Sequence, residues 1–300
     1  MRPSELPLRP DGSVYHIAMK PGQASHRCLL LGDPGRVALV ESLLDEVQHR
    51  GGNREFVWLT GLYRGKSITA LGTGIGADNT EIALVELDAL HNIDLGRGVP
   101  FPTHKKLYFL RVGTCGLLQP EASLGAAVFS SSAVGVDPLP LFYETSLDTD
   151  LAEALDSYCR KVRGVSCPLP WYAVSATPFF LSQARRYLPA GLPWVEGITY
   201  SAPGFYGPQG RIGRGRVRFP AFADLLASFS YQGIRIQNIE MEAAPLYALA
   251  HAFGHEAGAL CLGIAHRQKG EFIYQDGGPS PEESMKRILE IGLEWLSDVP

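Results

Sequence analysis

Hydrophobic residues fall into two kinds of segment that alternate along the chain. Short apolar runs, typical of buried strands, occupy residues 28–31, 67–71, 106–116, 124–136, 194–200 and 257–265. Segments with apolar residues every three or four positions, typical of helices, occupy residues 37–47, 80–90, 150–160, 180–188, 243–250 and 281–296. With no interdomain linker or repeat between them, these segments predict a single α/β domain around a mixed sheet.

The first strand runs into a tight loop, GDPGR at residues 32–36, and then into a predicted helix. At such a junction the N–H groups of the loop and the dipole of the helix favour an anion. Arg36 stands at this point and carries a planar fork of donors that suits phosphate or carboxylate. The same residues would also fit a plain connector loop in which Asp33 caps the helix. The motif alone therefore leaves open whether the loop binds an anion or only connects the two elements.

A glycine-rich turn, GTGIG at residues 72–76, differs from a dinucleotide fingerprint because the final glycine and the later ribose-binding acid are missing. It is better interpreted as a turn that lets the backbone approach a ligand closely. The strand at residues 106–116 is expected to place Arg111 and Thr114 at its carboxyl end, where α/β sheets bind their ligands. Together with Arg36 these groups would suit one phosphate, unless Arg111 forms a structural ion pair.

Two polar groups further along remain ambiguous from the residues alone. Gln209 and Arg211 lie in a loop rich in Gly and Pro, beside the flat faces of Phe205 and Tyr206. The run NIEME, residues 238–242, places two carboxylates around a methionine where a helix is predicted to begin. Either group could also consist of ordinary surface residues. Whether it binds a ligand therefore depends on what the rest of the chain supplies.

Composition excludes several classes of protein. A net charge of -4 and a pI near 6.1 provide no basic field for a nucleic-acid partner. The five cysteines are odd in number and widely spaced, which favours a reduced, cytoplasmic protein over a disulfide framework or a zinc site. The N-terminus lacks the apolar stretch of a signal peptide, and no segment approaches the roughly 18 apolar residues that span a bilayer. We therefore expect no membrane partner.

Six short motifs give the chain a recognisable relationship. LGDPGRV, REF, TGIG, LRVGTCG, FYGPQGR and NIEMEAA occur in the order and approximate spacing of the nucleoside phosphorylase family, and the chain is most similar to the branch that acts on uridine. The similarity extends from about His16 to Arg267. It implies a single nucleoside phosphorylase domain over residues 1–300, with a central mixed β-sheet flanked by α-helices. The proline-rich region at about 162–193 resembles an insertion.

The resemblance implies roles for residues at the matching motif positions. Phosphate would be held by Gly32, Arg36, Arg111 and Thr114, with Arg54 reaching in from a neighbouring subunit. Ribose would be held by Met241 and Glu242, with Glu240 close by and His16 offered by a partner chain. The pyrimidine base would be bound by Gln209 and Arg211, with Phe205 stacking near the sugar or base. The groups expected to act in catalysis are Arg36, Arg111, Arg211 and Glu242.

The implied reaction is the reversible phosphorolysis of uridine to uracil and ribose 1-phosphate, with deoxyuridine and thymidine as further candidate substrates. Phosphate is then a co-substrate, and the family requires no metal and no organic cofactor. Some relatives hold a monovalent cation between subunits, to which Glu55 and Ile75 would correspond. Asp78 and Asn79 differ from the residues that are usual at these positions in such relatives. The sequence therefore leaves open whether a cation is bound. Because active sites would be shared, a homo-oligomer is expected, either a dimer or a hexamer of dimers.

Two other functions remain as alternatives. One is a purine nucleoside phosphorylase or a nucleosidase of the same fold, which the pair Gln209 and Arg211 disfavours. The purine-directed aspartate expected after residue 260 is absent, since residues 265–268 read AHRQ. The other is a catalytically silent nucleoside-binding protein. The sequence leaves open the preference for ribose or deoxyribose, the choice between uracil and thymine, and the role of the insertion.

Overall fold

The computed structural model describes residues 1–163, 170–186, 192–274 and 280–300. The strands are β1 (Arg27–Leu31), β2 (Glu46–Asn53), β3 (Phe56–Tyr63), β4 (Lys66–Gly72), β5 (Ile93–Asp94), β6 (Val99–Pro100), β7 (Tyr108–Leu117), β8 (Ala127–Gly135), β9 (Tyr172–Ser175), β10 (Trp194–Ser201), β11 (Ser230–Tyr231), β12 (Ile234–Glu240), β13 (Glu256–His266) and β14 (Glu271–Phe272). The helices are α1 (Val37–Glu41), α2 (Ala77–Asn92), α3 (Thr149–Arg163), α4 (Pro178–Arg186), α5 (Phe222–Ala227), α6 (Ala243–Phe253) and α7 (Pro281–Ser297). Short 3₁₀ turns are η1 (Pro34–Arg36), η2 (Leu139–Phe142) and η3 (Gly207–Gln209).

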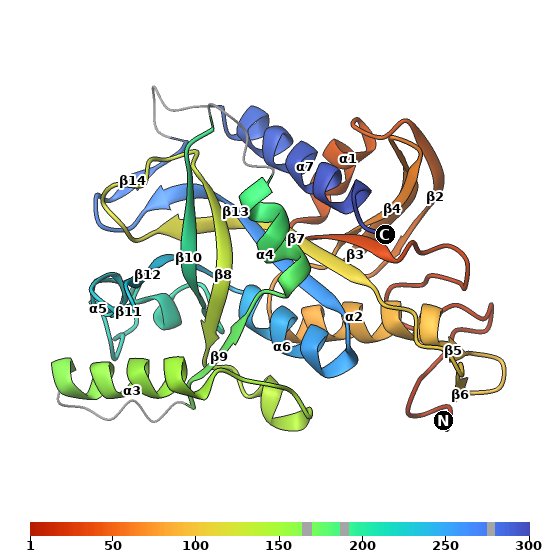
Figure 1. The fold of residues 1–300 in the computed structure, drawn as a ribbon, viewed down its shortest axis with the longest axis horizontal. Helices are drawn as coiled ribbons and strands as arrows, with labels where there is room; N and C mark the ends of the chain where they lie inside the picture. The colour runs from red at the N-terminus through yellow and green to blue at the C-terminus, as the bar shows by residue number, and fades with distance from the viewer. Residues whose placement is uncertain (164–169, 187–191, 275–279) are drawn as a thin grey trace.

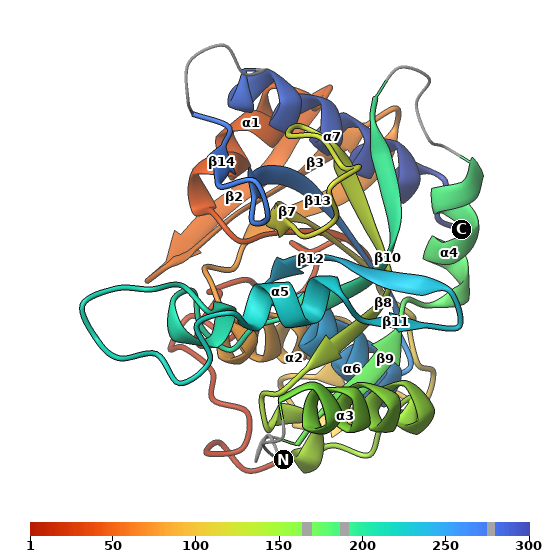
Figure 2. The same ribbon diagram turned by 90° about the vertical axis from the view of Figure 1, so that its left-hand side faces the viewer.

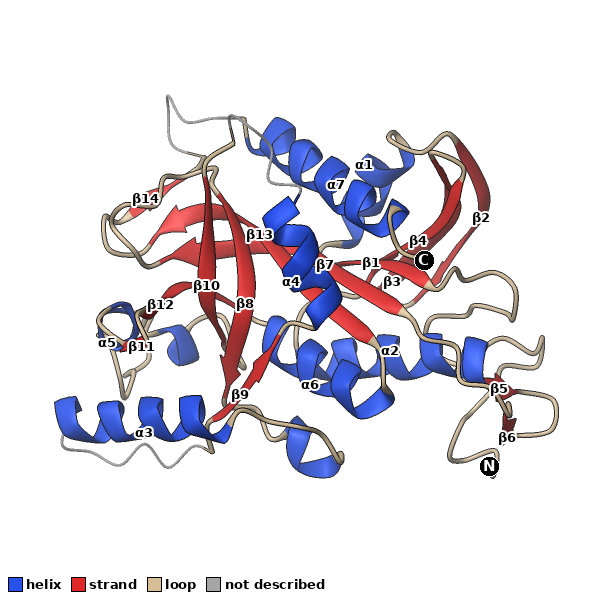
Figure 3. Ribbon diagram, in the orientation of Figure 1, coloured by secondary structure: helices blue, strands red, loops and turns tan. Residues whose placement is uncertain are grey.

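A large mixed sheet runs through the molecule, with helices on both of its sides (Figures 1 and 3). Its main path has the order β11-β12-β10-β8-β13-β7-β1-β4-β3-β2, while β9 pairs with β8 and β14 with β13. Helix α7 packs on β1, β7 and β13 on one side, and α6 packs on β8, β10 and β13 beside α2 on the other. The predicted fold class, an α/β fold with a flanked central mixed sheet, is confirmed.

The pairing around β7 determines where functional side chains meet. β1 and β13 lie on either side of β7 and both run parallel to it, so the three strands end at the same edge. β12 runs antiparallel to β7 and meets its end, with Asn238 opposite Leu117. Residues that follow β1, β12 and β13 are therefore brought to one place.

The interior reflects the apolar runs of the sequence. All of β1 is buried, and the C-terminal part of α7 packs Trp295 against Phe129, with 5.7 Å between the ring centroids. Ser280 caps α7 by accepting from the N–H of Glu283, and Pro281 is its first residue. No described helix is both long and apolar enough to cross a bilayer.

Some predicted boundaries are wrong. The helix expected over residues 37–47 ends at Glu41, because the chain turns, the N–H of Asp45 donates to Leu62 O, and the following residues pair with β3 as strand β2. β7 continues to Leu117, so Arg111 and Thr114 lie within the strand and not at its end.

Residues 92–105, between α2 and β7, contain the small β5–β6 hairpin. Of the proposed insertion at about 162–193, residues 164–169 and 187–191 lie outside the described residues, and the remainder contains β9 and α4. The insertion and the single-domain boundaries stay predictions.

Candidate active site

A cavity of about 560 Å³ opens where β1, β7, β12 and β13 come together with the loop around η3. It collects most of the residues singled out in the sequence: Gly32, Arg36, Arg111, Thr114, Phe205, Gln209, Arg211, Glu240, Met241 and Glu242. Motifs far apart in the chain thus face one volume. His16 and Arg54 are not among its lining residues.

Arg111 lies at the buried end of this cavity, with its side chain folded back over its own strand. A Cβ added at Gly113 would lie 2.0 Å from Arg111 Nη1, so the glycine leaves the space that the guanidinium occupies. The guanidinium donates to Glu242, lies 3.4 Å from Glu240 Oε2 and contacts Cys261 Sγ at 3.2 Å. Burial opposes its charge, but the two carboxylates raise the Arg111 pKa above its ordinary value. Arg111 is therefore a permanent cation in the cavity.

The two carboxylates of the NIEME run have different surroundings. Glu240 is engaged by the protein: it accepts from Ser201 Oγ at 2.5 Å and from the main-chain N–H groups of Glu242 and Ala243 at 2.9–3.0 Å. It thus caps the start of α6 and steadies Arg111. Its place near the ribose stays a prediction, and its oxygens are already occupied by these donors.

Glu242 faces the cavity directly. One of its oxygens accepts from Gly76 N–H at 2.8 Å and the other pairs with Arg111. Burial raises the pKa of Glu242 despite the opposing effect of Arg111. A carboxylate of this kind can accept from sugar hydroxyls while Arg111 turns its remaining donors toward an anion.

Arg36 supplies a second guanidinium from the loop after β1. The Asp33 side chain accepts from Gly35 N–H at 2.9 Å, so the capping role considered for Asp33 also occurs. Burial lowers the pKa of Arg36, and the positive charge of Arg111 acts in the same direction, although Asp33 opposes both. Since two guanidiniums disfavour each other in a partly buried cavity, an anion between them would relieve that repulsion.

The loop around η3 forms a separate wall of the cavity. Gln209 is buried, and Arg211 lies over the ring of Phe205, 4.1 Å from its centroid. Burial, followed by the charge of Arg267, lowers the pKa of Arg211 to about 10. A flat apolar ring beside amide and guanidinium donors is suited to a planar, carbonyl-bearing ligand. The loop that precedes α5 projects from the body of the fold (Figure 2).

Sequence reasoning missed Arg267, which follows β13. Its Nη2 donates to the main-chain oxygen of Gln209 at 3.1 Å, which fixes the loop that carries Arg211. Arg211 Nε and Arg267 Nη1 are buried without a hydrogen-bond partner in the described structure. Such groups favour a ligand that accepts. The available signal was a guanidinium directly after a buried strand, at the strand end where ligands collect in α/β sheets.

His16 and Arg54 lie together on a different surface. The ring of His16 is 2.7 Å from Glu86, and Arg54 donates to Tyr15 Oη at 3.2 Å. Tyr15 contacts both, because its ring meets that of His16 edge-on and lies under the Arg54 guanidinium. The two residues expected to serve a neighbouring subunit thus form one exposed patch outside their own cavity.

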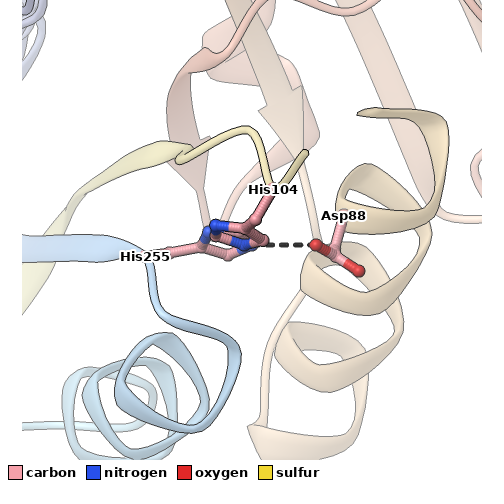
Figure 4. A group of neighbouring side chains, drawn as sticks. All are labelled: Asp88, His104 and His255. Atoms are coloured by element: carbon pink, nitrogen blue, oxygen red, sulfur yellow. Dashed lines mark hydrogen bonds and ion pairs between the residues drawn. The ribbon is translucent and has the colours of Figure 1, made fainter. Parts of the chain in front are cut away.

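One cluster in the described residues has the composition of a metal site. Candidate ligand atoms of Asp88, His104 and His255 lie within 4.8 Å of one another (Figure 4). However, His255 Nδ1 accepts from Leu107 N–H at 3.3 Å, so Nε2 carries the proton and donates to Asp88 at 3.1 Å. The rings of His104 and His255 are stacked, so their lone pairs do not converge. The cluster fits a hydrogen-bonded support better than an ion site.

The fold and the charged groups of the cavity are suited to an anion held beside a flat polar ring. Residues 26–287 match the family described as the phosphorylase superfamily, and the chain belongs to it. The membership predicted from the six motifs is confirmed.

Relatives with assigned activities cover most of the chain. It is 34% identical over 269 residues to the uridine phosphorylase of Thermococcus kodakarensis, covering 90% of this chain and 83% of the relative. It is 25% identical over 264 residues to that of Escherichia coli, covering 86% and 88%. A Trypanosoma brucei nucleoside phosphorylase structure, described as showing uridine phosphorylase activity, superimposes with a TM-score of 0.84 at 26% identity, covering 98% of this chain and 100% of that one.

Proposed function

We propose that the protein catalyses the reversible phosphorolysis of uridine to uracil and ribose 1-phosphate. The observation that carries this proposal is the division of one cavity into two walls. Arg36 and Arg111 converge at the wall formed by β1 and β7, and Gln209, Arg211 and Arg267 stand at the wall formed by η3 and the end of β13. The similarity to uridine phosphorylases over most of the chain supports the same activity.

The chemistry assigned to these walls follows from charge. Phosphate held by Arg36 and Arg111 is the nucleophile at the anomeric carbon, and the bond that breaks is the one from that carbon to the base nitrogen. Positive charge then develops on the ribose, beside Glu242. Negative charge develops on the departing uracil, where Arg211 and Gln209 donate to its polar edge as in an oxyanion hole. The electron pair leaves with the base, which then takes up a proton.

No metal or organic cofactor is needed in this scheme, since phosphate supplies the nucleophile and side chains supply the charge. A monovalent cation near Glu55 and Ile75 stays a prediction. We further propose that the protein is a cytoplasmic enzyme of pyrimidine salvage. Cys28, Cys115 and Cys261 are buried and form no disulfide, which supports a reducing compartment.

The proposal includes a homo-oligomer with shared sites. Arg54 and His16 are held away from their own cavity, yet they match family positions that bind phosphate and ribose. A neighbouring subunit would bring them to the open side of each cavity. Light scattering would establish whether the assembly is a dimer or a hexamer of dimers.

A nucleoside screen with and without phosphate tests the function. Uridine should release uracil only when phosphate is present, with formation of ribose 1-phosphate, while adenosine, inosine and guanosine should react slowly. Release at the same rate without phosphate would indicate a nucleosidase, and faster release from a purine nucleoside would contradict the assigned base. Calorimetric binding of uridine without turnover at any phosphate concentration would indicate a nucleoside-binding protein.

A further inference from the structure

Two cysteines from neighbouring strands lie together at the phosphate wall of the cavity. Cys115 belongs to β7 and Cys261 to β13, and both are part of one buried cluster. The strands pair in parallel, with Cys261 opposite Gly113 and Cys115 opposite Gly263, so the two side chains are neighbours along the ladder. The Cys115 thiol forms a hydrogen bond with that of Cys261. The function proposed above uses neither sulfur.

Arg111 connects this pair of thiols to the site. Because side chains alternate along a strand, Arg111, Gly113 and Cys115 share one face of β7. The guanidinium folds back over Gly113, and its Nη1 lies 3.2 Å from Cys261 Sγ on the strand beside it. The two sulfurs and the cation therefore form one packed group. An atom bonded to both sulfurs would take up space against which the guanidinium is now packed.

The pair can be reached from the cavity. Cys115 is one of the lining residues, although its side chain is only 4% exposed, whereas Cys261 is fully buried. A ligand would therefore meet Cys115 first and Cys261 behind it. Such a ligand has to be small, and a neutral molecule enters the site at a lower desolvation cost than an ion.

The surroundings of the thiols determine which chemistry suits them. Burial, followed by the hydrogen bond with Cys261, raises the pKa of the Cys115 thiol. Since the thiolate is the nucleophile in disulfide exchange and in the reaction with peroxide, a protonated thiol reacts slowly by those routes. A centre that condenses with two protonated thiols and releases water is better suited to this pair. Trivalent arsenic, which at neutral pH is the small and uncharged trihydroxide, is such a centre.

We propose that Cys115 and Cys261 form a binding site for trivalent arsenic, and that filling this site displaces Arg111 and so prevents phosphate binding. Two arsenic–sulfur bonds form and two arsenic–oxygen bonds break. Each thiol proton leaves with a hydroxyl group as water, and arsenic remains trivalent. Two adjacent thiols bind arsenic more tightly than one, because the second bond forms within the molecule. The inhibition rests on the proposed function, whereas the binding does not.

The first experiment measures bound arsenic. The intact protein is incubated with sodium arsenite, desalted and assayed for arsenic per chain, for wild type, Cys115→Ser, Cys261→Ser and Cys28→Ser. Cys28 provides the matched control, since it is a buried strand cysteine of another cluster and its Sγ donates to Ser25 O at 3.2 Å. Wild type and Cys28→Ser should each hold one more arsenic per chain than the other two variants. Equal amounts in all four proteins would overturn the inference.

The second experiment measures inhibition. Initial rates of uracil release are determined at varied phosphate, with and without arsenite. In the fully loaded enzyme kcat/KM for phosphate should fall about 100-fold, the usual effect of misplacing a catalytic group by ~1 Å, while KM for uridine should change little. Dithiothreitol should restore the rate, because it offers two thiols to the arsenic. Cys115→Ser and Cys261→Ser, each compared with its own rate without arsenite, should resist the inhibition.

The outcomes separate the inference from the function on which its second half rests. Arsenic bound through both cysteines, in a wild type that carries out no uridine phosphorolysis, overturns the function and supports the site. Phosphorolysis by a wild type that binds no arsenic overturns the site alone, and bound arsenic with an unchanged KM for phosphate overturns the displacement of Arg111. If the serine variants do not fold, a crystal structure of arsenite-treated wild type decides: arsenic between Cys115 and Cys261 supports the inference, and its absence from that position contradicts it.

Discussion

Replacing Gly113 by alanine should disable phosphate binding while leaving the rest of the protein in place. The added Cβ would lie 2.0 Å from Arg111 Nη1 and 2.7 Å from Cζ. Because an ordinary contact needs about 3.4 Å, the guanidinium must move by more than ~1 Å. That movement pulls it from Glu242 and Glu240, which hold it now.

The size of the effect follows from this displacement. Overpacking of this kind costs about 1–3 kcal/mol of stability. A catalytic group misplaced by ~1 Å commonly costs ~100-fold in rate. We therefore expect kcat/KM for phosphate to fall about 100-fold at saturating uridine, with a higher KM for phosphate, and the thermal unfolding midpoint to drop by several degrees.

A second strand glycine separates the two effects. In Gly258→Ala the new Cβ would lie 2.6 Å from Phe180 Cγ, away from the cavity. This variant should lose comparable stability and keep the wild-type KM for phosphate. The measurements are initial rates at varied phosphate and a thermal melt of each variant. A Gly113→Ala enzyme with an unchanged KM for phosphate would refute the role given to the Arg111 position.

Three further changes test other parts of the site and the fold. Arg211→Ala should lower kcat/KM for uridine by about two to three orders of magnitude, since it removes a donor to the departing base, and full activity would contradict base recognition by this loop. Arg267→Ala should raise KM for uridine with little change in KM for phosphate, because Arg267 holds the main chain at Gln209; a change confined to phosphate would contradict this. Burial, with a smaller effect of Lys105, lowers the pKa of His91 to about 4 from 6.5, so the unfolded chain binds a proton more readily and stability is lost as pH falls from about 6.5 to about 4. His91→Gln should flatten that part of the curve of unfolding midpoint against pH, and an unchanged acid slope would show that another group is responsible.

Much of the fold could be predicted from local patterns, since buried strands such as β1 and β13 are continuous apolar runs and α7 carries its own cap. The error after Glu41 shows where such reasoning stops. Leu43, Leu44 and Val47 continue the helical spacing, but pairing with β3 overrides it. Local periodicity contains no information about a partner strand supplied by later residues.

The site was predictable in composition but not in contacts. Motif order pointed to Arg36, Arg111, Gln209, Arg211 and Glu242, and one cavity contains all five. The ion pair between Arg111 and Glu242 joins residues from two motifs with separately assigned roles, so only their positions in space could show it. Arg267 was not predicted because the family feature expected at that strand end is an aspartate, which is absent from residues 265–268.

The placement of the two cavity walls has a consequence for how the activity can change. Arg111 belongs to a central strand and is packed against Gly113, so altering the nucleophile's pocket disturbs the sheet on which folding depends. Gln209 and Arg211 stand at the start of the largely exposed segment that precedes α5, and the loop of that segment projects from the body of the fold (Figure 2). Base preference can therefore be redesigned by exchanging a peripheral segment, whereas a change of nucleophile requires rebuilding the centre of the molecule.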